Sequence, residues 1–188
     1  MCFFSLSGRP ESQSGFTLIE LMVTLSVAAI LATLSTGFSS LSQRNQLTTA
    51  LNTLVTDMNY TRSEAIKSGD EMVICISTDG ENCSRGDDWR LGWIIYSDSD
   101  GDRRRDPSET IKKYQNEING STQIQYNGRP VDNFIRFLPT GITNYNGTFS
   151  FCSRTIQSLK RVLVLSNTGR FRPSSHHPSG QAISCTSS

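Results

Sequence analysis

The stretch that decides the fold runs from Gly15 to Phe38 and reads GFTLIELMVTLSVAAILATLSTGF. It is mostly apolar and long enough to cross a bilayer as a helix, which needs about 20 such residues. Its one ionisable side chain is Glu20. Because a carboxylate is costly inside hydrocarbon, an acid at this position is expected to have a function. We therefore predict a transmembrane helix over residues 16–38 and a specific role for Glu20.

The residues around Glu20 follow a distinctive order. A polar leader ends at Gly15, and the apolar run starts at Phe16, four residues before Glu20. This G-F-T-L-I-E sequence resembles the prepilin signature of type IV pilins and type II secretion pseudopilins. The resemblance implies that a prepilin peptidase removes residues 1–15 and methylates Phe16. It also implies that Glu20 serves filament assembly by neutralising the α-amino group of Phe16 in a neighbouring pilin subunit, because an unpaired charge in an apolar core is costly.

An ordinary secretory signal or membrane anchor is the alternative. A secretory signal has its small-residue cleavage site after a shorter apolar core. Here the cleavage signature precedes the apolar run. The prepilin interpretation is therefore favoured, and it implies a single span in the inner membrane with the head in the periplasm, followed by incorporation into a pilus.

The charges of this chain of 188 residues are unevenly distributed, although its formal net charge is only +1. The last acidic residue is Asp132, and all charged residues after it are Lys or Arg. Such an asymmetry predicts a polyanion or an acidic surface as the partner of the C-terminal part. Nucleotide-binding, nucleophile-elbow and zinc-protease motifs do not occur in the sequence, so we expect neither an enzyme nor a cofactor.

Four cysteines remain once Cys2 leaves with the leader, namely Cys75, Cys83, Cys152 and Cys185. They allow three connectivities. Disulfides persist in the oxidising compartment that the membrane signal implies. Because Cys75–Cys83 closes a short local loop, we favour that pair together with Cys152–Cys185. The spacings do not suit a zinc site.

Residues 39–69 are predicted to continue the helix as an amphipathic half that ends at Gly69. Its polar positions include Asp57 and Arg62. Its apolar positions recur at helical intervals, which is typical of a helix that packs one stripe against a globular head: Leu47, Leu51, Leu54, Met58 and Ala65.

Residues 70–188 are expected to form a β-rich head with a C-terminal tail. The predicted strands are 72–77, 91–97, 110–114, 122–126, 134–138, 147–152 and 161–166. Asp-Gly and Asn-Gly pairs, which favour tight turns, lie between several of them. A long helix packed on an antiparallel sheet gives an α+β fold. This is also the type IV pilin fold, and the sequence around Cys75, Cys83 and Trp93 resembles the GspH/FimT group of minor pilins and pseudopilins.

A basic motif, Gly169-Arg170-Phe171-Arg172, follows the last predicted strand. It resembles the G-R-x-R motif of FimT-type minor pilins, which bind DNA during natural transformation. Residues i and i+2 of an extended segment point to the same side, so Arg170 and Arg172 can reach one phosphate backbone while Phe171 packs inward. Such binding is independent of DNA sequence and sensitive to salt.

Two alternatives to this interpretation stay open. The motif is also compatible with a hairpin turn that carries two solvated arginines, and Lys160 and Arg161 either extend the basic surface or form a solvated strand end. If these basic side chains are only solvated, the chain acts as a structural minor pilin or pseudopilin that primes or tips the filament without binding DNA.

An acidic loop between Asp98 and Glu109 is a further candidate site. Arg103 occupies the sixth position, where a calcium loop has Gly, and Arg104 and Arg105 follow. We therefore favour an acidic hairpin loop neutralised by its own arginines and predict no metal. The acids nevertheless match positions 1, 3, 5, 9 and 12 of the calcium-loop spacing: Asp98, Asp100, Asp102, Asp106 and Glu109.

Overall fold

The computed structural model describes residues 15–129, 133–174, 176, 180 and 183, except for the side chains of residues 33–39 and 129. The chain divides into two compact units, residues 1–39 and residues 40–188, which are described separately below. The predicted leader before Gly15 lies outside the described residues.

The first unit contains the beginning of helix α1 (Leu18–Ser68). Gly15 and Phe16 precede the helix and are exposed. The hydroxyl of Thr17 accepts a hydrogen bond from the backbone amide of Glu20 at 3.3 Å. A Thr followed by Glu three residues later is the capping-box pattern, and a carboxylate in the first turn is favoured by the helix dipole. The Thr17 hydroxyl therefore caps the start of the helix.

The large apolar side chains from Phe16 to Leu31 are each more than half exposed. None of the helical segments within the described residues combines the length and the apolarity needed to cross a membrane.

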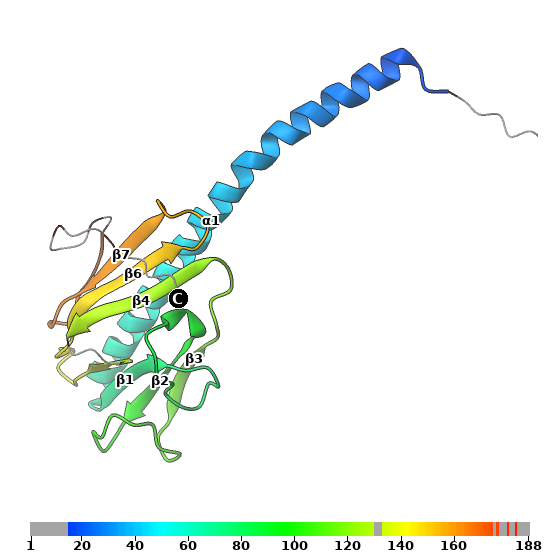
Figure 1. Cartoon of the computed structure of the whole chain (residues 1–188). Helices are drawn as coiled ribbons and strands as arrows, with labels where there is room; N and C mark the ends of the chain where they lie inside the picture. Colours follow the sequence, from blue (N-terminus) through cyan, green and yellow to red (C-terminus); the bar gives the residue numbers. More distant parts are fainter. Residues whose placement is uncertain (1–14, 130–132, 175, 177–179, 181–182, 184–188) are drawn as a thin grey trace, which may run out of the picture. The chain divides into compact units, whose positions relative to one another are not determined.

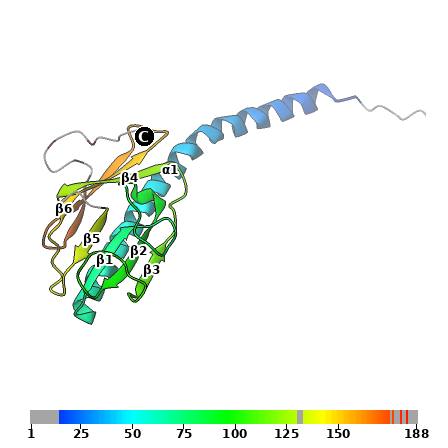
Figure 2. The same cartoon turned by 60° about the horizontal axis from the view of Figure 1, so that its bottom comes forward.

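The second unit contains two antiparallel sheets beside the C-terminal half of α1 (Figures 1 and 2). The first has the order β3-β2-β1-β5 and contains β1 (Glu71–Ile76), β2 (Trp93–Asp98), β3 (Ile111–Gln115) and β5 (Phe134–Phe137). The second has the order β4-β6-β7-β8 and contains β4 (Thr122–Arg129), β6 (Asn146–Ser153), β7 (Lys160–Leu165) and β8 (Phe171–Ser174). A short 3-10 helix, η1 (Trp89–Leu91), precedes β2.

These elements confirm the α+β pilin fold expected from the sequence. Each predicted strand is present with shifted ends, and Gly69 follows the last residue of α1 with the positive φ of 75° that favours glycine. Two features differ from the expectation. The strands form two sheets, and β8 adds a strand where the sequence indicated only an extended segment.

The core lies between α1 and both sheets. Every residue of the predicted apolar stripe is buried, which confirms the helical periodicity. The stripe joins a single cluster with side chains such as Ile74 and Trp93 of the first sheet and Phe149 and Leu163 of the second. One helix face therefore supplies apolar contacts to two sheets.

Asp57 is an exception to the sequence pattern. The pattern places it on the polar face of α1, but the structure buries it with 0% exposure, so that expectation is wrong. One carboxylate oxygen accepts a hydrogen bond from Trp93 Nε1 at 2.9 Å, and the other forms an ion pair with Lys113 Nζ. The first sheet thus brings a donor and a cation to the helix. A buried carboxylate is tolerated when it is paired in this way.

We predict that Lys113→Met lowers the free energy of unfolding by about 2–3 kcal/mol, because it leaves the Asp57 carboxylate buried without its cation. This is at or below the usual cost for a fully buried pair, since the Lys113 side chain is 41% exposed. Urea unfolding of the full chain in detergent measures the change. Adding Asp57→Asn should restore part of the loss.

Lys112→Met is the matched control, because Lys112 is exposed on the same strand. Its effect should stay within about 0.5 kcal/mol. Equal losses for Lys112→Met and Lys113→Met would contradict a stabilising role of the buried pair.

The face of the first sheet opposite α1 has a smaller core of Val73, Cys75, Ile94 and Tyr96. A disulfide joins Cys75 to Cys83 and holds the following loop against this face, which confirms the predicted local pair. Cys152 is also disulfide-bonded. Cys185 lies outside the described residues, so the predicted Cys152–Cys185 pair stays a prediction.

Asp79 organises the loop that this disulfide closes. Its carboxylate accepts hydrogen bonds from the amides of Glu81 and Asn82, both at 2.8 Å, and from the Asn82 and Ser77 side chains. These hydrogen bonds, above all those from Asn82, hold the pKa of Asp79 well below its usual value.

We predict that Asp79→Asn lowers the melting temperature at pH 7, because the amide group that replaces one oxygen faces the Asn82 donor. A lowered folded-state pKa adds stability above the unfolded value of 3.8 and loses it as the pH falls below that value. The difference from wild type should therefore shrink between pH 5 and pH 2 in thermal unfolding. A difference that is constant over this range would contradict the assignment.

Candidate nucleic-acid interface

The basic motif lies at the turn between β7 and β8, and β8 is an edge strand of the second sheet. In the antiparallel register Leu165 faces Phe171 and Val164 faces Arg172. The pairing continues one step further, because the amide of Ser166 donates to the Arg170 carbonyl at 3.1 Å. Both arginines therefore belong to one extended segment and project to the same side.

Phe171 projects to the opposite side and packs against the core. Its ring centroid lies 6.1 Å from that of Phe137, and its neighbour Leu165 is buried. Arg170 and Arg172 are both exposed. Within the described part of the chain, neither guanidinium group forms an ion pair or a hydrogen bond. The alternation predicted from the sequence thus leaves two cationic groups uncompensated at the surface.

A residue of α1, Arg62, packs against the turn and fixes its position. Gly169 has a φ of +73°, and a Cβ at this position would lie 2.4 Å from the Gly141 carbonyl oxygen and 2.9 Å from Arg62 Nε. Arg62 Nε also donates to that carbonyl at 2.7 Å. The motif therefore needs glycine at position 169 for two reasons, its backbone conformation and the close approach of its neighbours.

Sequence reasoning missed Arg62 as a part of this site. The residue is half-buried on α1 and is separated from Gly141 by 79 positions in the chain. It supports the loop on which the basic turn rests and adds a third arginine beside the turn. No local sequence signal marks such a contact, because only the packing of the second sheet on α1 creates it.

Lys160 and Arg161 lie at the end of β7 farthest from the arginine pair, and their part in the basic surface stays a prediction. Lys160 Nζ donates to the Ile183 carbonyl at 3.0 Å, so this group already has a partner. Arg161 is exposed at the end of β7 farthest from the turn, and its neighbours by alternation, Leu163 and Leu165, point into the core. It therefore points to the face opposite that of Arg172.

Comparisons with known proteins assign the chain to a family. A family profile described as type II transport protein GspH matches residues 50–169, which is more than half of the chain. The chain belongs to the GspH family of minor pilins and pseudopilins. A second profile, the prokaryotic N-terminal methylation motif, matches residues 12–36 of this GspH-family chain. A search of curated proteins gives no match.

The GspH-family fold agrees with a solved minor pilin. The type IV minor pilin FimU of Pseudomonas aeruginosa superposes with a TM-score of 0.55 at 21% identity, covering 73% of this chain and 92% of FimU. The minor pseudopilin EpsH from the type 2 secretion system of Vibrio cholerae gives 0.49 at 14% identity, with 69% and 96% covered. At this identity the likeness to FimU shows the fold alone.

We predict that Gly169→Ala destabilises this GspH-family chain more than Gly69→Ala does. Both glycines have nearly the same positive φ, 73° and 75°, but a Cβ at Gly69 meets nothing within 4 Å. Gly69→Ala should therefore cost only the left-handed conformation, about 1–2 kcal/mol. Urea unfolding compares the two, and equal losses would show that the contact with Arg62 and Gly141 is loose.

Proposed function

We propose that this minor pilin binds DNA without sequence preference through Arg170 and Arg172 and assists DNA uptake in natural transformation. The observation that carries the proposal is the exposed arginine pair at the start of the edge strand, which has no ion-pair partner among the described residues. Acidic residues are missing from the sequence after Asp132, so every charged residue of the segment that carries the pair is positive. A polyanion is the natural partner of such a surface.

The chemistry of the pair suits phosphate. A guanidinium group offers a planar fork of donors that matches phosphate oxygens, and two of them on one side of a strand follow a backbone. Neither contact reads a base edge, so the binding is independent of sequence. Because few phosphates are engaged, we expect a Kd per subunit of about 10⁻⁶ to 10⁻⁴ M, the range of non-specific complexes.

The N-terminal segment supports the filament part of the proposal. A prepilin peptidase would cut between Gly15 and Phe16 and methylate Phe16, and the helix would hold the chain in the inner membrane with its head in the periplasm. The exposed apolar side chains from Phe16 to Leu31 would then be covered by lipid and later by neighbouring subunits. Glu20 would neutralise the amino group of a neighbouring Phe16.

A purely structural role is the second candidate. In it, the chain primes or tips a pilus or a type II secretion pseudopilus through protein contacts alone. The extent of the family match favours this candidate, because the matched region ends at Gly169, just before the arginine pair. The pair is therefore outside the part of the chain that defines the family.

Fluorescence anisotropy with a labelled DNA duplex separates the two candidates. The full chain in detergent should bind the duplex, and Arg170→Gln with Arg172→Gln should weaken binding at least 10-fold. The slope of log K against log salt should fall by about 2, because the variant neutralises about two fewer phosphates than the wild type.

Arg85→Gln with Arg154→Gln is the control, because both residues are exposed and lie outside the motif. This variant removes the same charge and should keep its affinity within about 2-fold if the contact is local. Equal weakening in both double variants would mean that net charge alone attracts DNA. Absence of salt-dependent binding by the wild-type chain would leave the structural role.

A further inference from the structure

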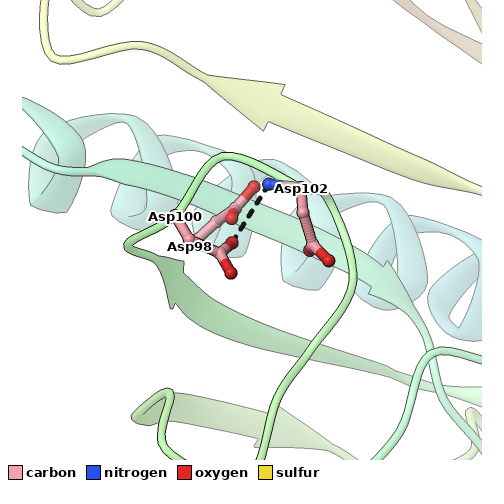
Figure 3. Close-up of side chains that lie close together, drawn as sticks. All are labelled: Asp98, Asp100 and Asp102. Carbon is pink, nitrogen blue, oxygen red and sulfur yellow. Dashed lines mark hydrogen bonds between the residues drawn. The ribbon is translucent and has the colours of Figure 1, made fainter.

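The loop that follows β2 gathers three carboxyl groups. Asp98, Asp100 and Asp102 each present an oxygen atom, and these atoms all lie within 4.8 Å of one another. Figure 3 shows the three side chains at one turn of the loop, with the amide of Asp102 donating to Asp100 Oδ1 at 3.1 Å. Two ligands on opposite sides of a Ca²⁺ ion lie about 4.6–5.2 Å apart, so one ion can touch all three groups.

The backbone of this loop has a left-handed residue at the position where a calcium loop has glycine. Arg103, at the sixth position, has a φ of +67°, the left-handed region that a calcium loop reaches with glycine. The amides of Gly101 and Arg103 donate to Asp98 at 2.9 and 3.1 Å. The objection raised by Arg103 in the sequence therefore does not hold for the folded chain.

The arginines of the loop are not paired with its acids. In the described part of the chain, Arg103, Arg104 and Arg105 form no ion pair with a carboxylate, although the sequence predicted that they neutralise the loop. Asp98 is only 2% exposed, and its nearest partners in the loop are backbone amides. A buried carboxylate of this kind is normally paired with a cation.

Glu109 closes the loop rather than joining the three aspartates. It is buried, and its two carboxylate oxygens accept the amides of Ser99 and Asp106 at 2.9 and 3.0 Å. It therefore ties the beginning of the loop to its end and acts as a positioning residue for the aspartates.

A buried hydroxyl group beside these acids has no partner. Tyr96 is fully buried, projects from β2 to the same face as Asp98, and its hydroxyl makes no hydrogen bond within the described residues. The Tyr96 hydroxyl and the Asp98 carboxylate therefore belong to one face of the first sheet, at the end of β2 where the acidic loop begins. Buried hydroxyls are nearly always hydrogen-bonded. A water molecule bound to a cation at the three aspartates would supply the missing partner.

We propose that this loop is a calcium site in which Asp98, Asp100 and Asp102 bind the ion and Tyr96 contacts one of its water ligands. Three carboxylates with water in the remaining positions suit a hard cation with six to eight oxygen ligands. Mg²⁺ fits less well, because it requires a tighter octahedron at about 2.0–2.1 Å. The site is separate from the arginine pair and does not depend on DNA binding.

Calorimetric titration of the full chain in detergent with CaCl₂, after removal of metals with EDTA, tests the proposal. We expect one saturable site with a Kd of about 10⁻⁴ to 10⁻³ M, the range of extracellular calcium modules. The melting temperature should rise with Ca²⁺, because the ion binds only the folded loop. Asp100→Asn with Asp102→Asn should weaken binding at least 10-fold.

Glu81→Gln with Asp87→Asn is the matched control, since both acids are exposed and lie in another loop. It should bind Ca²⁺ as the wild type does. Tyr96→Phe provides a second readout, because it should leave the melting temperature in EDTA unchanged or higher and reduce the rise caused by Ca²⁺. The proposal is overturned if the wild type shows no saturable binding up to about 10 mM Ca²⁺, well above the expected Kd, if Mg²⁺ binds equally well, or if the aspartate variant binds like the control.

Discussion

One face of α1 packs against both sheets, and the rest of the head depends on this packing. The buried residues of α1 from Leu47 to Ala65 contact side chains of both sheets in a single cluster. Burial of that apolar surface is the main favourable term for the head. Asp57 sits within this face, and its carboxylate is satisfied only when β2 presents Trp93 and β3 presents Lys113. These contacts therefore fix the position of the helix on the first sheet.

The flank of the same helix fixes the basic turn. Arg62 supports the Gly141 carbonyl, and both lie against Gly169, so the turn before β8 has little room to move. Phe171 then anchors the edge strand in the core near Phe137. The outward direction of Arg170 and Arg172 follows from these two contacts. A surface motif is thus oriented by residues that are not themselves part of the surface.

The acidic residues show how strongly environment decides the behaviour of one residue type. Asp79 is exposed and surrounded by amide and hydroxyl donors, so its charged form is stabilised and its pKa falls. Asp98 accepts two amides as well, but it is buried beside other carboxylates and its pKa rises. The first arrangement is complete without a ligand. The second leaves the Asp98 charge without an ion pair and the Tyr96 hydroxyl without a hydrogen bond among the described residues, which is why it, and not the Asp79 loop, carries the inference of a cation.

The sequence by itself determined the features that depend on local periodicity and short motifs: the α1 stripe, its end at Gly69, seven of the strands, the Cys75–Cys83 pair and the alternation of the basic motif. The tertiary structure alone decided the division into two sheets, the burial of Asp57 and the support of Gly169 by Arg62. It also decided the hydrogen bond of Lys160 to Ile183 and, within the described residues, the absence of ion pairs from the acidic loop. The physical reason is that most of these features join residues far apart in the chain or depend on desolvation, and neither leaves a periodic signal in the sequence.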